Sequence, residues 1–149
     1  MKILDLGCGK RQEHWHGDGL DYQDFGQKYV FNLEDVKPFP IADNEYDRVV
    51  AYHILEHIKS PEAFINILNE IWRVTKPGGR FIGAVPHFMS KNFRRDPFHI
   101  REFDEFSFDG YLENSPIYFN DYGLLCVFRK IYINVNQNHD VCWELEIVK

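Results

Sequence analysis

The sequence LDLGCGK, residues 4–10, places a short apolar run directly before a glycine turn. Leu4 and Leu6 are typical of a central parallel strand, because both faces of such a strand are covered by other elements. Gly7 and Gly9 end the strand, and glycine lets a ligand approach the main chain closely. In open α/β sheets, ligands bind beyond the carboxyl ends of the strands. The segment therefore predicts a strand followed by a ligand-binding turn.

The spacing of this turn argues against a ligand with phosphate groups. A dinucleotide-binding turn needs a third glycine where this chain has Gln12, and it leads into a helix whose N-terminus holds a pyrophosphate. Residues 11–18 lack the apolar stripe of such a helix. The chain also lacks the phosphate-loop pattern G-x-x-x-x-G-K-[ST]. A ligand without phosphates is therefore favoured.

Downstream patterns predict further strands and helices. Short apolar runs predict strands at residues 3–6, 19–22, 29–33, 46–52, 80–85, 124–135 and 141–148. Ser60 and Pro61 form a helix start, and the apolar spacing after them predicts a helix that ends before residues 77–79, PGG. A second helix is predicted over residues 102–111, with its phenylalanines in the core or, as the less favoured alternative, in the walls of an acceptor pocket. The polar residues 136–140 are typical of a hairpin turn.

The order of these motifs resembles that of class I S-adenosylmethionine-dependent methyltransferases of the type 11 group. The matching stretches are LDLGCGK, GLDY, FNLED, PFPIADNEYDRVVAYHILEHI, EIWRVTKPGGRFIGAVPHF and DPFHIREF. The resemblance implies an α/β fold, a Rossmann-like three-layer sandwich, as a single domain over residues 1–149. Its seven-stranded, mostly parallel sheet would have the strand order 3-2-1-4-5-7-6, with the last strand antiparallel.

The same resemblance implies S-adenosylmethionine as the cofactor and S-adenosylhomocysteine as its product. By position, the implied cofactor-binding residues are Asp5, Gly7, Cys8, Gly9, Asp21, Asn32, Leu33, His53 and Leu55. The glycine turn would contact the methionine part of the cofactor, and Asp21 would hold the ribose. Asn32 and Leu33 would lie near the adenine, while His53 and Leu55 would line the sulfonium end. Cys8 is expected to be a small filler whose thiol does no chemistry.

The implied reaction moves a methyl group to an oxygen, nitrogen or carbon nucleophile of a small molecule by in-line displacement. Histidine suits the work of a general base near neutral pH. The candidates for catalysis are His53, His87 and His99, and replacing His87 by alanine is expected to lower turnover far more than cofactor affinity. The basic residues 91–101 are either an acceptor-binding loop for a carboxylate or phosphate, or a solvated loop. The acceptor-binding candidates are His87, Arg94, Arg95, His99 and Arg101.

The sequence HILEH, residues 53–57, also fits the zinc-peptidase pattern H-x-x-E-H. A zinc hydrolase needs a third ligand, for which Glu102 or Glu113 could serve. The motif directly follows a predicted buried strand, where the resembling methyltransferases have a similar sequence. We therefore expect no metal, and we expect Glu56 and His57 to orient the loop by hydrogen bonding.

Two helices usual in the resembling family are not predicted in this chain. One precedes the first strand, and the other directly follows the glycine turn, where this chain has a loop with His14, Trp15 and His16. Because a parallel sheet needs cover on both faces, we expect a second copy or a partner chain to cover the thinly protected face.

The overall composition bears on compartment and acceptor. The formal net charge of -6 disfavours a nucleic acid, since binding of its phosphates relies on basic surface. The widely spaced Cys8, Cys126 and Cys142 indicate reduced thiols rather than a disulfide framework. With no leader pattern and no long apolar run, we expect a cytoplasmic protein without membrane contact. A non-catalytic cofactor-binding protein and an RNA or DNA methyltransferase remain as alternatives.

Overall fold

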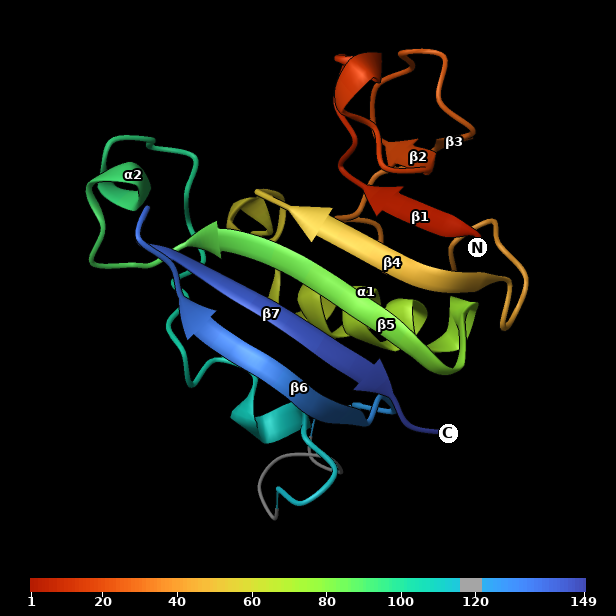
Figure 1. The fold of residues 1–149 in the computed structure, drawn as a ribbon. Helices are drawn as coiled ribbons and strands as arrows, with labels where there is room; N and C mark the ends of the chain where they lie inside the picture. The colour runs from red at the N-terminus through yellow and green to blue at the C-terminus, as the bar shows by residue number, and fades with distance from the viewer. Residues whose placement is uncertain (116–121) are drawn as a thin grey trace.

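The computed structural model describes residues 1–115 and 122–149. Its strands are β1 (Ile3–Leu6), β2 (Asp18–Asp21), β3 (Tyr29–Val30), β4 (Tyr46–Tyr52), β5 (Thr75–Pro86), β6 (Phe128–Val135) and β7 (Asp140–Ile147). They form one seven-stranded sheet in the order β3-β2-β1-β4-β5-β7-β6 (Figure 1). Pairing is parallel from β3 through β5, and β7 runs antiparallel to both of its neighbours. The implied strand order and directions are confirmed.

The main helix begins as the sequence predicts. The helices are α1 (Pro61–Val74) and α2 (Lys91–Arg94), with three-residue 3-10 turns η1 (Gln12–His14), η2 (Leu55–His57) and η3 (Asp109–Tyr111). Ser60 Oγ accepts a hydrogen bond of 3.1 Å from the Ala63 N–H at the start of α1. The apolar side of α1 packs against the sheet and contributes Ile67, Leu68 and Ile71 to the core.

The helix predicted over residues 102–111 is wrong, because that segment folds into turns that end in η3. Asp104 Oδ1 accepts hydrogen bonds from the Phe106 N–H and from the Ser107 hydroxyl, at 3.0 and 2.9 Å. Such local bonds from a side chain compete with helical ones. The core assignment holds for Phe103 and Phe108, which are 2% and 0% exposed, whereas Phe106 is 66% exposed.

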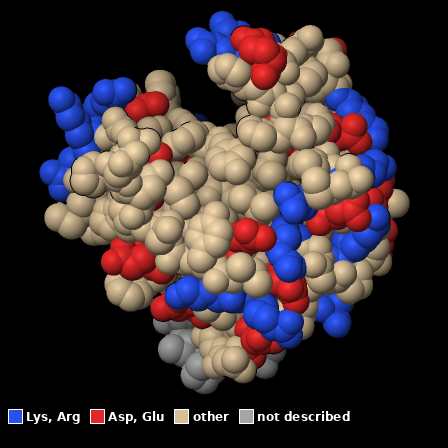
Figure 2. Space-filling view, in the orientation of Figure 1, with Lys and Arg blue, Asp and Glu red and all other residues tan. Residues whose placement is uncertain are grey.

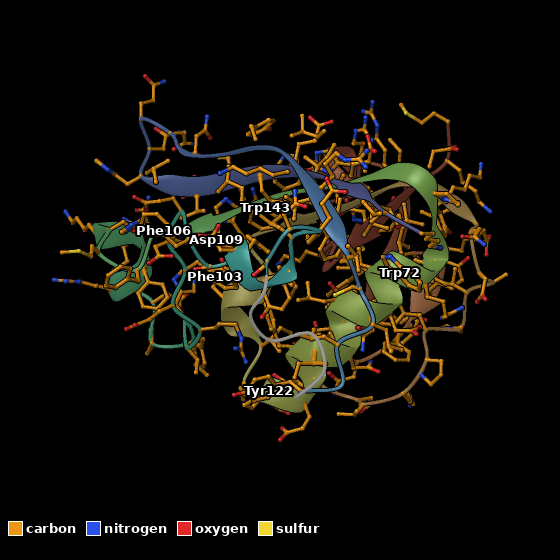
Figure 3. The ribbon with its side chains drawn as sticks, turned by 90° about the horizontal axis from the view of Figure 1, so that it is seen from below. Trp72, Phe103, Phe106, Asp109, Tyr122 and Trp143 are labelled. Atoms are coloured by element: carbon orange, nitrogen blue, oxygen red, sulfur yellow. The ribbon has the colours of Figure 1, made fainter. Side chains whose placement is uncertain are left out.

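The two faces of the sheet differ in cover. Helix α1 lies behind the sheet as it is drawn in Figure 1, and Trp143 and Phe103 lie on that same side (Figure 3). Within the described residues no helix covers the other face, so this layer of the expected sandwich is not formed. Residues 10–30 form only η1, β2 and β3 with their loops.

Ion pairs occupy part of the uncovered face. Arg80 of β5 contacts Glu144 and Glu146 of β7 at 3.2 and 2.7 Å, and Arg129 of β6 contacts Glu146 at 2.6 Å. Figure 2 shows this charged strip on the face toward the viewer. On β5 and β7, Arg80, Glu144 and Glu146 each adjoin a buried apolar residue that points toward α1. This part of the sheet therefore needs no helical layer to keep apolar side chains from water.

The C-terminal hairpin is confirmed. Asn136 Oδ1 accepts hydrogen bonds from the N–H groups of Asn138 and Asp140, at 2.9 and 3.0 Å, which closes the turn between β6 and β7. The strand before this turn begins at Phe128, later than the predicted residue 124.

Neither α1 nor any other helix within residues 1–115 and 122–149 has the length and apolar character needed to cross a membrane.

Candidate functional site

The glycine turn joins the carboxyl end of β1 to the loop that leads to β2. Gly7 and Gly9 both have left-handed backbones, with φ of +66° and +65°. The Gly7 N–H donates to Leu20 O at 2.8 Å, and the Gly9 N–H donates to Asp21 Oδ2 at 3.0 Å. A Cβ atom added at Gly7 would lie 2.6 Å from Ile54 Cγ1, so any larger residue would collide there. Both the left-handed backbone and the lack of space for a Cβ atom therefore require glycine at position 7.

Two cavities border the turn, one on each side of Gly7. The first, of about 620 Å³, is lined by Asp5, Gly7, Cys8, Trp15, His16 and Tyr52, among others. The second, of about 330 Å³, is lined by Gly7, Asp21, Asn32, Leu33, Ile54 and His57, among others. Figure 2 shows a hollow between the part of the molecule with η1 to β3 and the part with α2. The turn thus opens into space that an elongated ligand could occupy.

Most of the implied cofactor residues meet at these cavities. Six of the nine line one or the other: Asp5, Gly7, Cys8, Asp21, Asn32 and Leu33. Gly9 and His53 line neither, although both adjoin lining residues. Leu55 has no exposed surface and lies in the core, while its neighbour Ile54 forms a wall of the second cavity.

The carboxylates of Asp5 and Asp21 hold the loops around the turn. Asp5 Oδ2 accepts the His16 backbone N–H at 2.9 Å and lies 3.1 Å from His16 Nδ1. Asp21 accepts from the Gly9 and Gln23 N–H groups through its two oxygens, at 3.0 and 3.2 Å. A carboxylate has about four acceptor positions, so each retains capacity for a ligand.

Cys8 lies between these two acids. Burial, together with the negative charges of Asp21 and Asp5, raises the pKa of its thiol to about 11. The group therefore stays a neutral thiol near pH 7, which accords with the expected role of a small filler.

His53 stands between two lining residues, Tyr52 of the first cavity and Ile54 of the second. Its backbone is left-handed, with φ of +55°, and its N–H donates to Ala84 O at 2.8 Å. Its side chain is 52% exposed, with Nδ1 3.6 Å from Glu56 Oε1. This carboxylate raises the pKa of His53, while burial acts in the opposite direction. A strained, exposed histidine at the end of a central strand is a good candidate for contact with substrate.

His87 lies at a different cavity, which it lines with Lys91 and Glu105. Its Nδ1 accepts the Met89 N–H at 3.1 Å, and its Nε2 lies 3.4 Å from Glu105 Oε2. A shallow cavity beside it is lined by Met89, Lys91, Arg94 and Arg95. Figure 2 shows Lys and Arg gathered over the part of the molecule that carries α2.

The other two acceptor candidates point away from this basic surface. His99 is turned inward, with only 11% of its side chain exposed and Nε2 3.9 Å from Glu56 Oε1. Arg101 places its guanidinium 4.3 Å from the centre of the Phe64 ring. The N–H groups of Ile100 and Arg101 both donate to Glu56 O, at 2.8 and 2.9 Å, which draws this segment to η2. The predicted acceptor residues thus fall into two separate groups.

The zinc-peptidase pattern lacks the helix it needs. Its two histidines must lie on one face of an α-helix, but here His53 is left-handed and η2 is a single 3-10 turn over Leu55–His57. His53 and His57 are therefore not presented as a helical pair.

Sequence reasoning missed Tyr52 and Ile54 as walls of the cavities. Both directly adjoin His53 at the carboxyl end of β4, which pairs with β1. Their position beside the glycine turn was a usable signal, because adjacent parallel strands end at the same edge of a sheet.

Residues 17–83 match a family model described as a methyltransferase domain. A curated protein from Mycolicibacterium smegmatis, named a probable S-adenosylmethionine-dependent methyltransferase, is 27% identical over 135 aligned residues. The alignment covers 76% of this chain and 50% of that protein, so the chain spans about half the length of its curated relative.

Solved structures share the fold at low sequence identity. A SAM-dependent methyltransferase from Aquifex aeolicus is similar with a TM-score of 0.65 and 18% identity, over 99% of this chain and 82% of that one. A second similar structure is the Burkholderia thailandensis 1,6-didemethyltoxoflavin-N1-methyltransferase, crystallised with 1,6-didemethyltoxoflavin and S-adenosylhomocysteine. Its TM-score is 0.64 and its identity 14%, over 99% of this chain and 71% of that one. A chain from the Haloferax volcanii complex of the Trm112 methyltransferase activator with a putative methyltransferase is also similar. Its TM-score is 0.60 and its identity 15%, over 99% of this chain and 82% of that one.

Proposed function

We propose that the chain is a class I S-adenosylmethionine-dependent methyltransferase that methylates a small molecule, which the methyltransferase-domain match and the similar S-adenosylmethionine-dependent methyltransferases support. The observation that carries this proposal is the glycine turn at the end of β1, which opens on both sides into a cavity. Gly7 allows the close approach to the main chain that a cofactor in this position needs. The residues fit a ligand with an apolar ring at one end and a charged group at the other.

The chain's own residues would divide the cofactor between the two cavities. Leu33 and Ile54 offer apolar walls for the adenine, and Asp21 beside them offers carboxylate oxygens for the ribose hydroxyls. Asp5 faces the other cavity, where a carboxylate suits the amino group of the methionine part. Bound there, the cofactor supplies a methyl group already activated by its sulfonium.

His53 is the residue we assign to the acceptor's proton. It lies on the chain between the walls of the two cavities, and its imidazole is half exposed. Catalysis of such a displacement rests mainly on holding the nucleophile in line at about 3 Å from the methyl carbon. A histidine at this border can both orient a hydroxyl or amine and accept its proton.

The acceptor is proposed to be a small anionic molecule. Lys91, Arg94 and Arg95 lie across the hollow from the glycine turn, on the part of the molecule that carries α2. The net charge of -6 speaks against a long nucleic acid. The toxoflavin-precursor enzyme from Burkholderia thailandensis, with the same fold, binds a small molecule. The three free thiols are compatible with a cytoplasmic setting.

Transfer of a labelled methyl group tests the reaction. Purified protein is incubated with methyl-labelled S-adenosylmethionine and a fractionated metabolite extract, and label is followed into acceptors. Replacing His53 by alanine is expected to lower turnover about 10²- to 10⁴-fold, the usual contribution of a general base, and to leave cofactor affinity within about threefold. His87→Ala is measured in parallel as the competing candidate, since His87 lines a separate cavity.

Cofactor binding without any transfer would favour the non-catalytic alternative. A larger loss of turnover in His87→Ala than in His53→Ala would identify His87, rather than His53, as the general base.

We also propose that a second copy of the chain covers part of the sheet face opposite α1. Tyr52 and Tyr132 are 38% and 40% exposed there, beyond the strip of ion pairs that Arg80 forms. We expect light scattering at high protein concentration to give twice the mass of one chain. A single-chain mass at the highest soluble concentration would contradict the proposal.

A further inference from the structure

Three side chains with metal-binding groups meet beside the proposed methyl-transfer site. Glu56 and His57 belong to η2, and His99 comes from the segment after α2. One ligand atom from each lies within 4.8 Å of the other two. The rings of His57 and His99 meet edge to face, with centres 4.8 Å apart. His99 is distant from HILEH, residues 53–57, in the sequence and reaches it only in the folded chain, so the sequence around Glu56 does not predict this contact.

Glu56 is the buried member of this cluster. Its side chain is 0% exposed, and neither carboxylate oxygen has a hydrogen-bond partner among the described residues. Removing a carboxylate from water without a partner costs several kcal/mol, and proteins therefore pair such groups or use them to bind a metal. A positively charged group next to Glu56 would therefore stabilise its buried carboxylate.

Each of the two histidines has one ring nitrogen beside a backbone carbonyl, which leaves its other ring nitrogen available to a ligand. His57 Nδ1 lies 3.0 Å from Phe98 O, and His99 Nδ1 lies 3.2 Å from Phe93 O. A carbonyl can only accept, so each Nδ1 carries the hydrogen and each Nε2 keeps its lone pair in the neutral ring. Histidines that bind metals have this arrangement, in which the second ring nitrogen donates to a carbonyl or carboxylate.

The ring nitrogens of two histidines lie close to carboxylate oxygens at this point. His99 Nε2 lies 3.9 Å from Glu56 Oε1 and 3.3 Å from Asp96 Oδ2. His53 Nδ1 approaches the same Glu56 oxygen at 3.6 Å from the other side. A proton on His99 or a metal ion can each resolve the repulsion between a nitrogen lone pair and a carboxylate oxygen, and the two have different experimental signatures.

We propose that Glu56, His57 and His99 bind one divalent zinc ion, with a water molecule as the fourth ligand. Two imidazole nitrogens and one carboxylate oxygen are an established ligand set for zinc. Ligand atoms around tetrahedral zinc stand roughly 3.3–3.5 Å apart, given bonds of about 2.0–2.2 Å. Glu56 Oε1 and His99 Nε2 are 3.9 Å apart, and the ligand atoms of all three residues lie within 4.8 Å of one another, so side-chain rotations must bring them closer to reach that spacing.

This site differs from the one that H-x-x-E-H would form in a zinc hydrolase. There the two histidines of the motif bind the metal and the glutamate acts as base. Here Glu56 is a ligand, His99 replaces His53, and the ion joins η2 to the segment after α2. Its role is to hold these two loops together next to His53, independently of cofactor binding.

The test uses untagged protein freed of metal with a chelator. Wild type and the variants His57→Gln, His99→Gln and His14→Gln are dialysed against micromolar zinc, and bound zinc is measured by mass spectrometry of the metal. We expect one zinc per chain in wild type and in His14→Gln, whose histidine is exposed in η1. Each of the other two variants is expected to bind zinc at least about 100-fold more weakly, because even outer-shell changes cost about 10–100-fold.

Circular dichroism and urea unfolding show whether each variant is folded. The hydrogen bonds from the Ile100 and Arg101 N–H groups to Glu56 O remain in both, so both are expected to fold. Zinc should also raise the thermal midpoint of wild type but not that of His57→Gln or His99→Gln. The proposal is overturned if folded wild type retains no zinc, which assigns the charge to a proton. It is also overturned if folded His57→Gln and His99→Gln bind zinc with the same affinity as His14→Gln.

Discussion

Replacing Gly7 by alanine is expected to destabilise the protein by about 2–5 kcal/mol and to weaken S-adenosylmethionine binding about 100-fold or more. The left-handed backbone at φ +66° costs a residue with a Cβ about 1–2 kcal/mol. The new methyl group would lie 2.6 Å from Ile54 Cγ1, and relieving such an overlap costs about 1–3 kcal/mol. Since Ile54 is a wall of the second cavity, its displacement deforms the binding site itself. Urea unfolding and cofactor titration measure the two effects.

Gly78→Ala is the matched control for backbone strain. Gly78 also has a left-handed backbone, with φ +73°, but a Cβ there would meet nothing within 4 Å. It lies at the start of β5, at the opposite end of the strand from the glycine turn. We expect a loss of about 1–2 kcal/mol and unchanged cofactor affinity. Equal effects of Gly7→Ala and Gly78→Ala on affinity would contradict the assignment of the site.

Replacing Trp143 by alanine is expected to lower the free energy of unfolding by about 3–5 kcal/mol. Trp143 has no exposed surface, and its ring centre lies 4.8 Å from that of Phe108 and 5.5 Å from that of Phe81. A Cβ on Gly83 would lie 2.3 Å from Trp143 Cζ2, so the indole fills the space above that glycine. The side chain thus joins β7, β5 and the segment before η3 in one aromatic cluster on the α1 side (Figure 3). Urea unfolding monitored by circular dichroism gives the change.

A second variant separates packing from hydrogen bonding at this position. Trp143 Nε1 is buried without a hydrogen-bond partner among the described residues. Trp143→Phe removes that N–H and keeps an aromatic ring, so we expect a loss clearly smaller than in Trp143→Ala. Equal losses in the two variants would show that the ring contacts do not carry the stability.

The parts of the fold that depend on local signals could be predicted from the sequence. The strand before Gly7, the start of α1 at Ser60 and Pro61, and the turn at Asn136 are each specified by neighbouring residues. Capping and turn formation act within a few residues, so a short window contains their cause. The strand order came from the family resemblance, because local patterns do not specify which strands pair.

The predictions that failed depend on local side-chain hydrogen bonds that compete with a helix, on the turn of one loop, or on contacts between distant residues. The turns after Phe103 arise from the Asp104 and Ser107 side chains, which displaced a helix that the phenylalanine spacing favoured. The approach of His99 to Glu56 depends on a segment far away in the chain. Ile54 rather than Leu55 faces the cavity because the backbone of the loop after β4 turns at His53. Of these arrangements, the approach of His99 to Glu56 has no local sequence signal.

Calorimetric titration of the purified chain with S-adenosylmethionine tests the central claim most directly, with S-adenosylhomocysteine and ATP as parallel ligands. A cofactor site at the glycine turn predicts saturable binding of the first two at one per chain, no binding of ATP, and loss of both affinities in Gly7→Ala but not in Gly78→Ala. Folded protein that binds neither S-adenosylmethionine nor S-adenosylhomocysteine, or that binds ATP equally well, would contradict the claim.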